Sequence, residues 1–250
     1  VLVFGSLAAF WLYTSSQISP LLTILIVIPI SFIGNLLIYN LLLAPLVRRS
    51  KSRGALEVDS ILATFGMSFI LIGIMTSIEG GFFAYKYLSE PIQILGSTTS
   101  LSRLVAFLIA TLIALVLYLW LNKTRSGVAV RAVSVSTEAA GLVGINVPRI
   151  SAFAFAIGGA ITAVGGALIS TFITLDASIG VVFTLKALII VIMGGVGEIR
   201  GAIIAAIILG IVETTVATLV DPGLTLAAAY FIFVLILLFR PQGLFGRRNT

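Results

Sequence analysis

Two ionisable side chains stand inside apolar runs that are otherwise free of charge, Lys186 in one run and Glu213 in the next. Lys186 lies 12 residues before Glu198, and Glu213 lies 13 residues after Arg200, so two helices joined at that point would hold both charges at similar depth. A lone charge at the centre of a bilayer costs at least ~2.5–3.5 kcal/mol, so opposite charges at one level are expected to pair or to line a wet cavity. We expect Lys186 and Glu213 to form such a pair, which either fixes a helix hairpin or lines a path for solute.

A second pattern lies in the polar connection 122–149, where four residues have the types and spacing of a short helix: Glu138, Ala139, Ala140 and Gly144. Thr137 can cap the N-terminus, Glu138 suits the positive end of the helix dipole, and alanine has the highest helix propensity. Gly144, followed by Pro148, would end the helix. The pattern predicts a surface helix of about 10 Å, which is marginal alone and must be held by its own domain or by a docked partner.

Glycines crowd the stretch between the two charged runs, and three of them predict a tight turn: Gly194, Gly195 and Gly197. Glycine allows a positive φ and close approach of backbones. A dinucleotide-binding pattern would need a glycine where Arg200 stands, so the sequence argues against a nucleotide site. None of the four lysines follows a glycine, which also argues against a phosphate loop for ATP.

Small residues recur at every fourth position in another apolar run: Gly158, Thr162, Gly166 and Ser170. Small side chains let two helices approach without lipid between them. We therefore expect this stripe to be a packing face, either within the chain or against a second subunit.

The composition indicates the solvent in which these residues work. The chain has 250 residues, 60% of them hydrophobic and 10% charged, and its mean hydropathy is +1.23. Too few charges are present to cover a water-exposed surface, so a membrane is the expected solvent. With no His and no Cys, the sequence lacks the commonest general base and the usual ligands of transition metals. We expect no catalytic residue, no metal site and no cofactor, and the chain is not expected to be an enzyme.

The apolar runs predict an all-α, polytopic transmembrane bundle of about eight segments in a single domain over residues 1–250, with the loop 122–149 inside it. The segments are expected at 1–13, 21–47, 60–78, 104–122, 150–175, 178–193, 201–219 and 222–239. The sixth segment is short, so it should thin the bilayer or be partly re-entrant. Since the first segment has only about 13 residues and starts at a valine, we expect a further N-terminal segment outside the sequence given.

The basic residues fit one orientation of these segments. If the first segment starts in the cytoplasm, the connections after the second, fourth, sixth and eighth segments are cytoplasmic. They hold all but three of the 15 Lys and Arg residues, the exceptions being Lys86, Arg103 and Lys186. This bias predicts a cytoplasmic C-terminus. The charge of +6 lies in short clusters between apolar runs, which argues against nucleic-acid binding.

The four-residue pattern at Glu138, Ala139, Ala140 and Gly144 resembles the EAA loop by which permeases of ATP-binding-cassette importers dock onto their ATPases. The sequence around it, from Gly127 to Leu168, resembles LivH-type permeases of branched-chain amino-acid importers. Three further stretches share this resemblance: Leu185–Glu213, Phe239–Arg248 and, more weakly, Val58–Ser68. In the EAA pattern a longer spacer usually follows the glycine, whereas Ile145–Pro148 follows Gly144 directly here.

The resemblance implies a permease subunit in a bacterial inner membrane that moves branched-chain or related amino acids inward by alternating access. It implies four kinds of partner: a second homologous permease, two cytoplasmic ATP-binding subunits, an extracytoplasmic solute-binding protein and membrane lipid. A urea or other small-solute permease of the same family is the first alternative. A secondary transporter without ATPases and a membrane-embedded enzyme are further alternatives, and the absence of His and Cys weighs against the enzyme.

Overall fold

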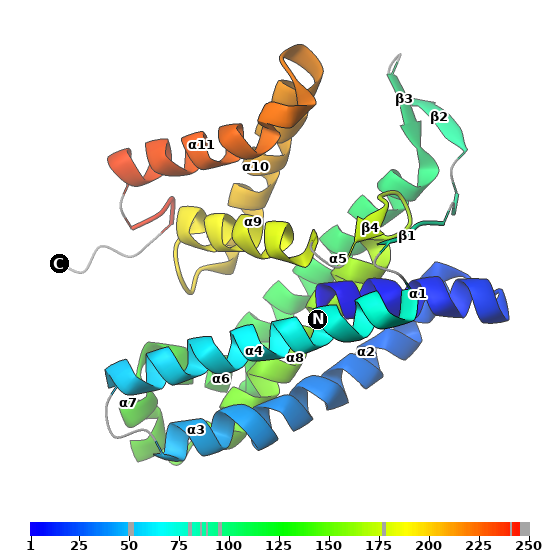
Figure 1. Ribbon diagram of the computed structural model, residues 1–250. Helices are drawn as coiled ribbons and strands as arrows, with labels where there is room; N and C mark the ends of the chain where they lie inside the picture. The colour runs from blue at the N-terminus through cyan, green and yellow to red at the C-terminus, as the bar shows by residue number, and fades with distance from the viewer. Residues whose placement is uncertain are drawn as a thin grey trace. The chain divides into compact units, whose positions relative to one another are not determined.

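The computed structural model describes residues 1–49, 53–79, 82–85, 87–88, 90–94, 97–176, 179–240 and 242–245. Contacts divide the chain into two compact units (Figure 1). The first unit comprises Val1–Val116 and Leu121–Ile179, and the second comprises Leu117–Trp120 and Gly180–Thr250.

All eight apolar segments predicted from the sequence correspond to helices. The fifth, expected to reach residue 175, ends as a helix at Ile169 and is followed by a short strand, and position 178, where the sixth was expected to begin, lies outside the described residues. Six helices in the described part of the chain are long and apolar enough to cross a membrane, and two shorter apolar helices accompany them, Leu2–Ser16 and Ile179–Gly194. The prediction of an all-α, polytopic membrane protein is therefore confirmed.

The first unit begins with two helices joined by a tight turn. Helix α1 is Leu2–Ser16 and helix α2 is Pro20–Ile38. Gln17 adopts the left-handed conformation at the end of α1, and the Ser19 side chain accepts a hydrogen bond from the Leu22 amide at the start of α2. A π-helical turn, η1 (Tyr39–Leu43), then leads into α3, Ala44–Arg49. The predicted second segment is thus one continuous run of helical turns of changing type.

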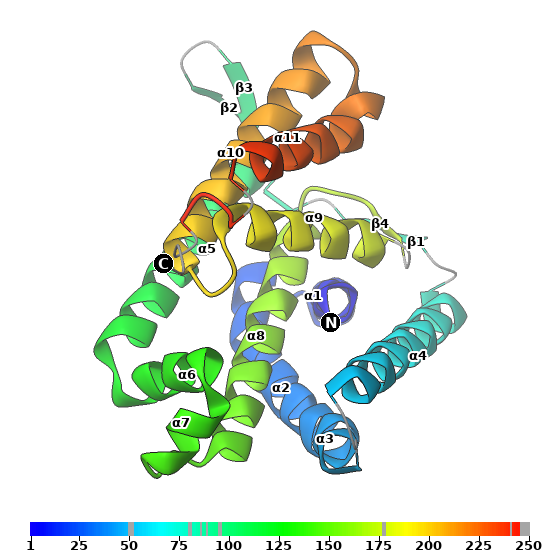
Figure 2. The same cartoon turned by 90° about the vertical axis from the view of Figure 1, so that its left-hand side faces the viewer.

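Helix α8, Val147–Ile169, packs against both α1 and α2 (Figure 2). Its contact face consists of buried small residues, among them Ala152, Ala156, Ala160, Ala163 and Ala167. Such residues let the neighbouring backbones approach closely, so van der Waals contacts replace lipid between the helices.

The connections at one end of the first unit form short strands. Helix α4 is Arg53–Glu79 and helix α5 is Leu101–Lys123. Between them, β1 (Phe82–Phe83) pairs antiparallel with β4 (Leu175–Asp176), which follows α8. The strands β2 (Pro91–Ile94) and β3 (Ser97–Ser100) form an antiparallel hairpin. Sequence analysis did not predict these strands.

The connection 122–149 forms two helices. Helix α6 is Arg125–Val135, capped by Thr124, and helix α7 is Thr137–Leu142. Only α7 was predicted. Figures 1 and 2 place α3 and α7 at one end of the first unit and β1 with β4 at the other. This arrangement is the one that the alternating orientation of the segments requires.

Besides the Leu117–Trp120 stretch of α5, the described part of the second unit holds three helices and a 3₁₀ turn: α9 (Ile179–Gly194), α10 (Ile199–Leu219), η2 (Pro222–Leu224) and α11 (Thr225–Phe239). Its core joins all three helices through buried apolar residues: Ile189, Met193, Ala205, Leu209 and Ala229. Helix α9 has 16 residues and so spans about 24 Å, less than the ~30 Å hydrocarbon core of a bilayer.

Candidate coupling helix and intramembrane ion pair

Helix α7 contains three of the four residues of the predicted docking pattern, and the fourth ends it. Ala140 is buried, while Glu138 and Ala139 are exposed. Gly144 has a φ of 84°, a left-handed conformation that glycine adopts without the strain of a side chain. The Ile145 amide then donates to the Ala140 carbonyl at 3.0 Å, which satisfies a carbonyl in the last turn of the helix.

The N-terminal cap of α7 is Ser136, so the prediction of Thr137 as the cap was wrong by one position. The Ser136 side chain accepts a hydrogen bond from the Ala139 amide at 3.2 Å, and its backbone is extended. Thr137 is the first helical residue, where a hydroxyl no longer faces the free amides. Ser and Thr are both favoured N-caps, so the backbone geometry decides which of the two adjacent residues takes that position.

Contacts with α6 and α8 hold α7 within the first unit. The side of α7 away from them carries two large apolar residues that sequence analysis did not select. Leu142 is 89% exposed and Val143 is 75% exposed. Both lie within the predicted pattern, between Ala140 and Gly144, and an apolar pair in a polar connection is the signal that would have identified them.

The structure brings Lys186 and Glu213 together within the second unit. The Lys186 Nζ atom donates to Oε2 of Glu213 at 2.9 Å and lies 2.8 Å from Oε1. The side chains are 23% and 20% exposed. The Phe183 ring centroid lies 5.8 Å from Nζ, in range of a cation–π contact. Counting residues outward from the glycine turn was sufficient to place these two charges side by side.

The turn between α9 and α10 uses its glycines in two ways. Gly195 and Gly197 have positive φ values of 102° and 87°. Gly194 instead permits close packing, since a Cβ there would collide with the backbone of Gly201 and Ala202. Gly201 makes the reciprocal approach and was not predicted.

Residues near the C-terminus close over this turn. The Leu244 amide donates to the Met193 carbonyl at 2.8 Å, and the Phe245 amide donates to the Gly194 carbonyl at 3.2 Å. Gly243 has a φ of 82° and lies against the backbone of Gly195. These contacts satisfy the last two carbonyls of α9, which have no partner inside the helix.

Arg200, which was predicted near the cytoplasmic surface, has a partner that sequence analysis did not find. Its guanidinium group donates to the Tyr118 hydroxyl, with Nε at 2.9 Å, and lies 5.0 Å from the centre of the same ring. Both residues belong to the second unit. The contact holds the start of α10 to the penultimate turn of α5.

The predicted packing stripe on α8 divides into two halves. Gly166 and Ser170 are buried, and a Cβ on Gly166 would collide with the Leu2 carbonyl in α1. Gly158 and Thr162 are exposed, with open space around Gly158. An interval of four residues exceeds the 3.6 residues of a helical turn, so the stripe rotates around the helix and cannot face one neighbour throughout.

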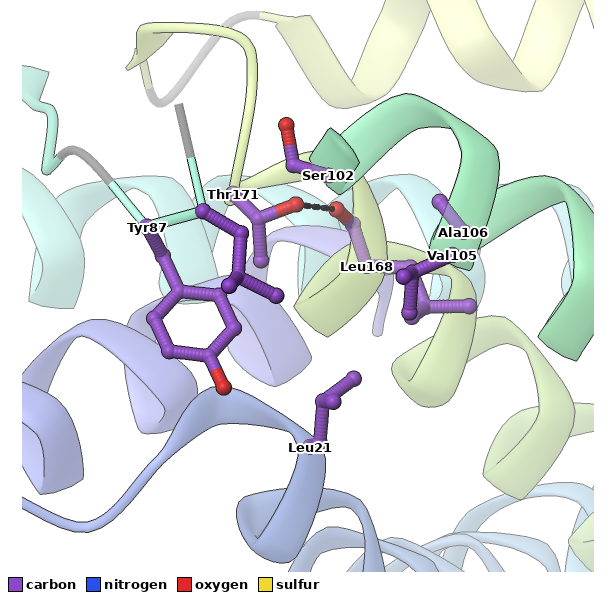
Figure 3. Close-up of a pocket in the computed structure, with 8 residues that line it drawn as sticks. Leu21, Tyr87, Ser102, Val105, Ala106, Leu168 and Thr171 are labelled. Carbon is purple, nitrogen blue, oxygen red and sulfur yellow. Dashed lines mark hydrogen bonds between the residues drawn. The ribbon is translucent and has the colours of Figure 1, made fainter. Parts of the chain in front are cut away.

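The end of the first unit that carries β1 and β4 holds a small pocket (Figure 3). It is lined mainly by apolar atoms, with Tyr87, Ser102 and Thr171 on its walls, and it has room for about one water molecule. Close by, Tyr85 stacks on Tyr13 at 5.1 Å and hydrogen bonds Ser170 at 2.9 Å. Burial raises the pKa of Tyr85, although its hydrogen bond to Ser170 opposes that shift. These side chains tie three chain segments together and leave no room for a solute.

The chain matches a family of known function over most of its length. The family model described as branched-chain amino acid transport system, permease component, matches residues 1–240. The chain belongs to this permease family. Among the residues that the structure describes in the permease, no three acidic side chains gather closely enough to hold a metal ion.

Several curated relatives resemble the permease. It is 28% identical to the high-affinity branched-chain amino acid transport system permease protein LivH of Salmonella typhimurium LT2, over 99% of this chain and 83% of the relative. It is 31% identical to the corresponding protein BraD of Pseudomonas aeruginosa PAO1, over 61% of this chain and 50% of the relative. It is 28% identical to the probable branched-chain amino acid transport permease protein LivH of Methanocaldococcus jannaschii, over 86% of this chain and 68% of the relative. No solved structure matches the permease.

Proposed function

We propose that this permease is the membrane subunit of an ATP-binding-cassette importer that moves branched-chain or related amino acids into a bacterial cell by alternating access. Family membership supports the transport role, and the names of the relatives support the substrate class. ATP hydrolysis takes place in two separate cytoplasmic subunits. A second homologous permease completes the path, and an extracytoplasmic protein delivers the solute.

Helix α7 is the feature that supports this proposal most directly. It is a short rod whose buried side is held by α6 and α8, while Glu138, Leu142 and Val143 project from its other side. An exposed apolar pair next to a carboxylate suits a groove on a protein partner better than it suits water. Because only four residues separate the end of α7 from the start of α8, force applied to α7 passes to a helix that packs against α1 and α2.

Two substitutions in this region test the proposal. Glu138→Lys reverses the charge on the docking side, and Gly144→Leu forces a side chain into a left-handed conformation, which costs about 1–2 kcal/mol. We expect leucine uptake per ATP hydrolysed to fall at least several-fold in proteoliposomes containing the complex, while the complex still assembles. Ser134→Ala is the control, because this exposed hydroxyl of α6 bonds only the Arg131 carbonyl within the part of the chain that the structure describes. Unchanged uptake by both variants would contradict the coupling role of α7.

A secondary transporter is the alternative that one observation favours. Lys186 and Glu213 form an ion pair inside the apolar helices α9 and α10. Ion-coupled transporters also use charged side chains within the membrane. The two functions predict different partners. Purification of the tagged permease under mild conditions should recover ATPase subunits in an importer, whereas a secondary transporter would be recovered without them.

A further inference from the structure

The ion pair lies midway along α9 and nearer to the end of α10 than to its start. Lys186 is seven residues from Ile179 at the start of α9, and Glu213 is six residues from Leu219 at the end of α10. At 1.5 Å a residue, the pair lies about 10 Å from these ends, which face the extracytoplasmic side in the predicted topology. Toward the glycine turn, Lys186 is eight residues from Gly194, or about 12 Å, and Glu213 is fourteen residues from Ile199, or about 21 Å. A solute that enters from outside would therefore meet Glu213 in the outer half of α10 and Lys186 at the middle of α9.

The Lys186 ammonium group lies within 2.9 Å of both oxygens of the Glu213 carboxylate. An ammonium group has three N–H donors, and Lys186 uses one of them on Oε2 of Glu213. Within the described part of the chain, Oε1 of Glu213 is buried and receives no aligned hydrogen bond, although Nζ lies 2.8 Å away. Oε1 is thus closed to a solute, but Oε2 can accept a second hydrogen bond, and Lys186 keeps at least one N–H donor that no described residue accepts. A pair whose only task was to fix the hairpin would gain stability by satisfying these groups.

The surroundings leave the pair open on one side. About a fifth of each side chain is exposed. Because contact of a charge with hydrocarbon is costly, this exposed side suits a wet path better than lipid. Gly210 lies one turn from Glu213 on α10, is itself exposed and has open space where a Cβ would stand. Phe183 provides an apolar wall on the Lys186 side. The open space at Gly210 therefore lies close to one positive and one negative side chain.

We propose that Lys186 and Glu213 bind the zwitterionic head group of an α-amino acid as it passes through the outer half of the path. The Lys186 ammonium group donates to the carboxylate of the solute, and the Glu213 carboxylate accepts from the ammonium group of the solute. A zwitterion brings the acceptor and the donors that the pair lacks, and it adds no net charge to the membrane interior. This inference rests on the proposed function, which supplies the substrate class.

The decisive variant removes both charges at once. Replacing a buried ion pair with apolar residues of similar volume often leaves stability unchanged, whereas removing one partner strands the other charge. We therefore choose Lys186→Met combined with Glu213→Leu. Thr215→Val is the matched control, because among the described residues this exposed hydroxyl on the same helix bonds only the Ile211 carbonyl of its own backbone.

The complete complex, reconstituted in proteoliposomes with its binding protein, is assayed for uptake of radiolabelled L-leucine, for ATP hydrolysis and for thermal unfolding. We expect the double variant to unfold at the wild-type temperature and to hydrolyse ATP, but to take up leucine roughly tenfold more slowly or worse, since two charge-assisted contacts are lost. Uptake within twofold of wild type would show that the pair is structural and overturn the inference.

A second variant tests the same site with the pair intact. Gly210→Leu fills the open space beside Glu213, and we expect a similar loss of leucine uptake with ATP hydrolysis retained. If the double variant does not assemble, this variant decides: uptake at the wild-type rate would overturn the inference. A wild-type complex without ATP-dependent leucine uptake would instead contradict the proposed function. If the wild type and both variants all take up leucine, the head-group site is contradicted and the proposed function is not.

Discussion

Two glycines of this permease have similar neighbours in the sequence but different surroundings in the structure. On α8, Gly166 meets the Leu2 carbonyl of α1, and Gly158, two turns away, faces open space. In the sequence the two belong to one regular stripe. The physical difference is the helix crossing point, because only there does one backbone come close enough to exclude a Cβ.

This difference predicts opposite effects of one substitution at two positions. Gly166→Ala should lower the thermal unfolding temperature, because the added methyl group forces α1 and α8 apart at a cost of about 1–3 kcal/mol. Gly158→Ala should leave the temperature unchanged or raise it slightly, since alanine favours a helix by about 0.5–1 kcal/mol. Unfolding of the purified permease in detergent measures both. If both variants lowered the unfolding temperature equally, the close approach of Gly166 to Leu2 would not contribute to stability.

At the scale of helices and strands, the sequence predicted the membrane-spanning elements better than the connections. Apolar run length identified all eight segments, because a bilayer imposes a minimum length on any helix that crosses it. Helix α6 and the four short strands were not predicted, since no such constraint applies outside the membrane. Within the candidate sites, the register of Lys186 and Glu213 followed from counting along two helices. The contact of Arg200 with Tyr118 did not, because it joins residues 82 positions apart.

The cap of α7 offers a test at this scale. Ser136→Ala removes the acceptor of the Ala139 amide, and loss of a cap costs ~1 kcal/mol, which is large for a helix of six residues. We expect faster hydrogen–deuterium exchange of the α7 amides and weaker coupling of ATP hydrolysis to uptake. Thr137→Ala is the control and should change exchange little. If both variants exchange at the same rate, the assignment of Ser136 as the cap is wrong.

At the scale of the whole molecule, the alternation of helices requires that α7 and the β2–β3 hairpin lie on opposite sides of the membrane. The chain contains no cysteine, so single cysteines can report accessibility without further changes. A membrane-impermeant maleimide should label Gln93→Cys on exposed β2 in intact cells and Leu142→Cys only in inverted vesicles. Leu62→Cys, exposed on the apolar helix α4, should stay unlabelled in both. Labelling of Leu142→Cys from outside would reverse the proposed orientation and remove α7 from contact with any ATPase.

The two hydrogen bonds from Leu244 and Phe245 to the end of α9 also bear on biosynthesis. A ribosome makes Met193 and Gly194 about fifty residues before it makes their partners. Until then, the last carbonyls of a helix shorter than the hydrocarbon core must find water or lipid headgroups instead. The hairpin of α9 and α10 therefore reaches its final state only after translation has passed α11, and a nascent chain stopped earlier should leave this hairpin open to proteolysis and quality control.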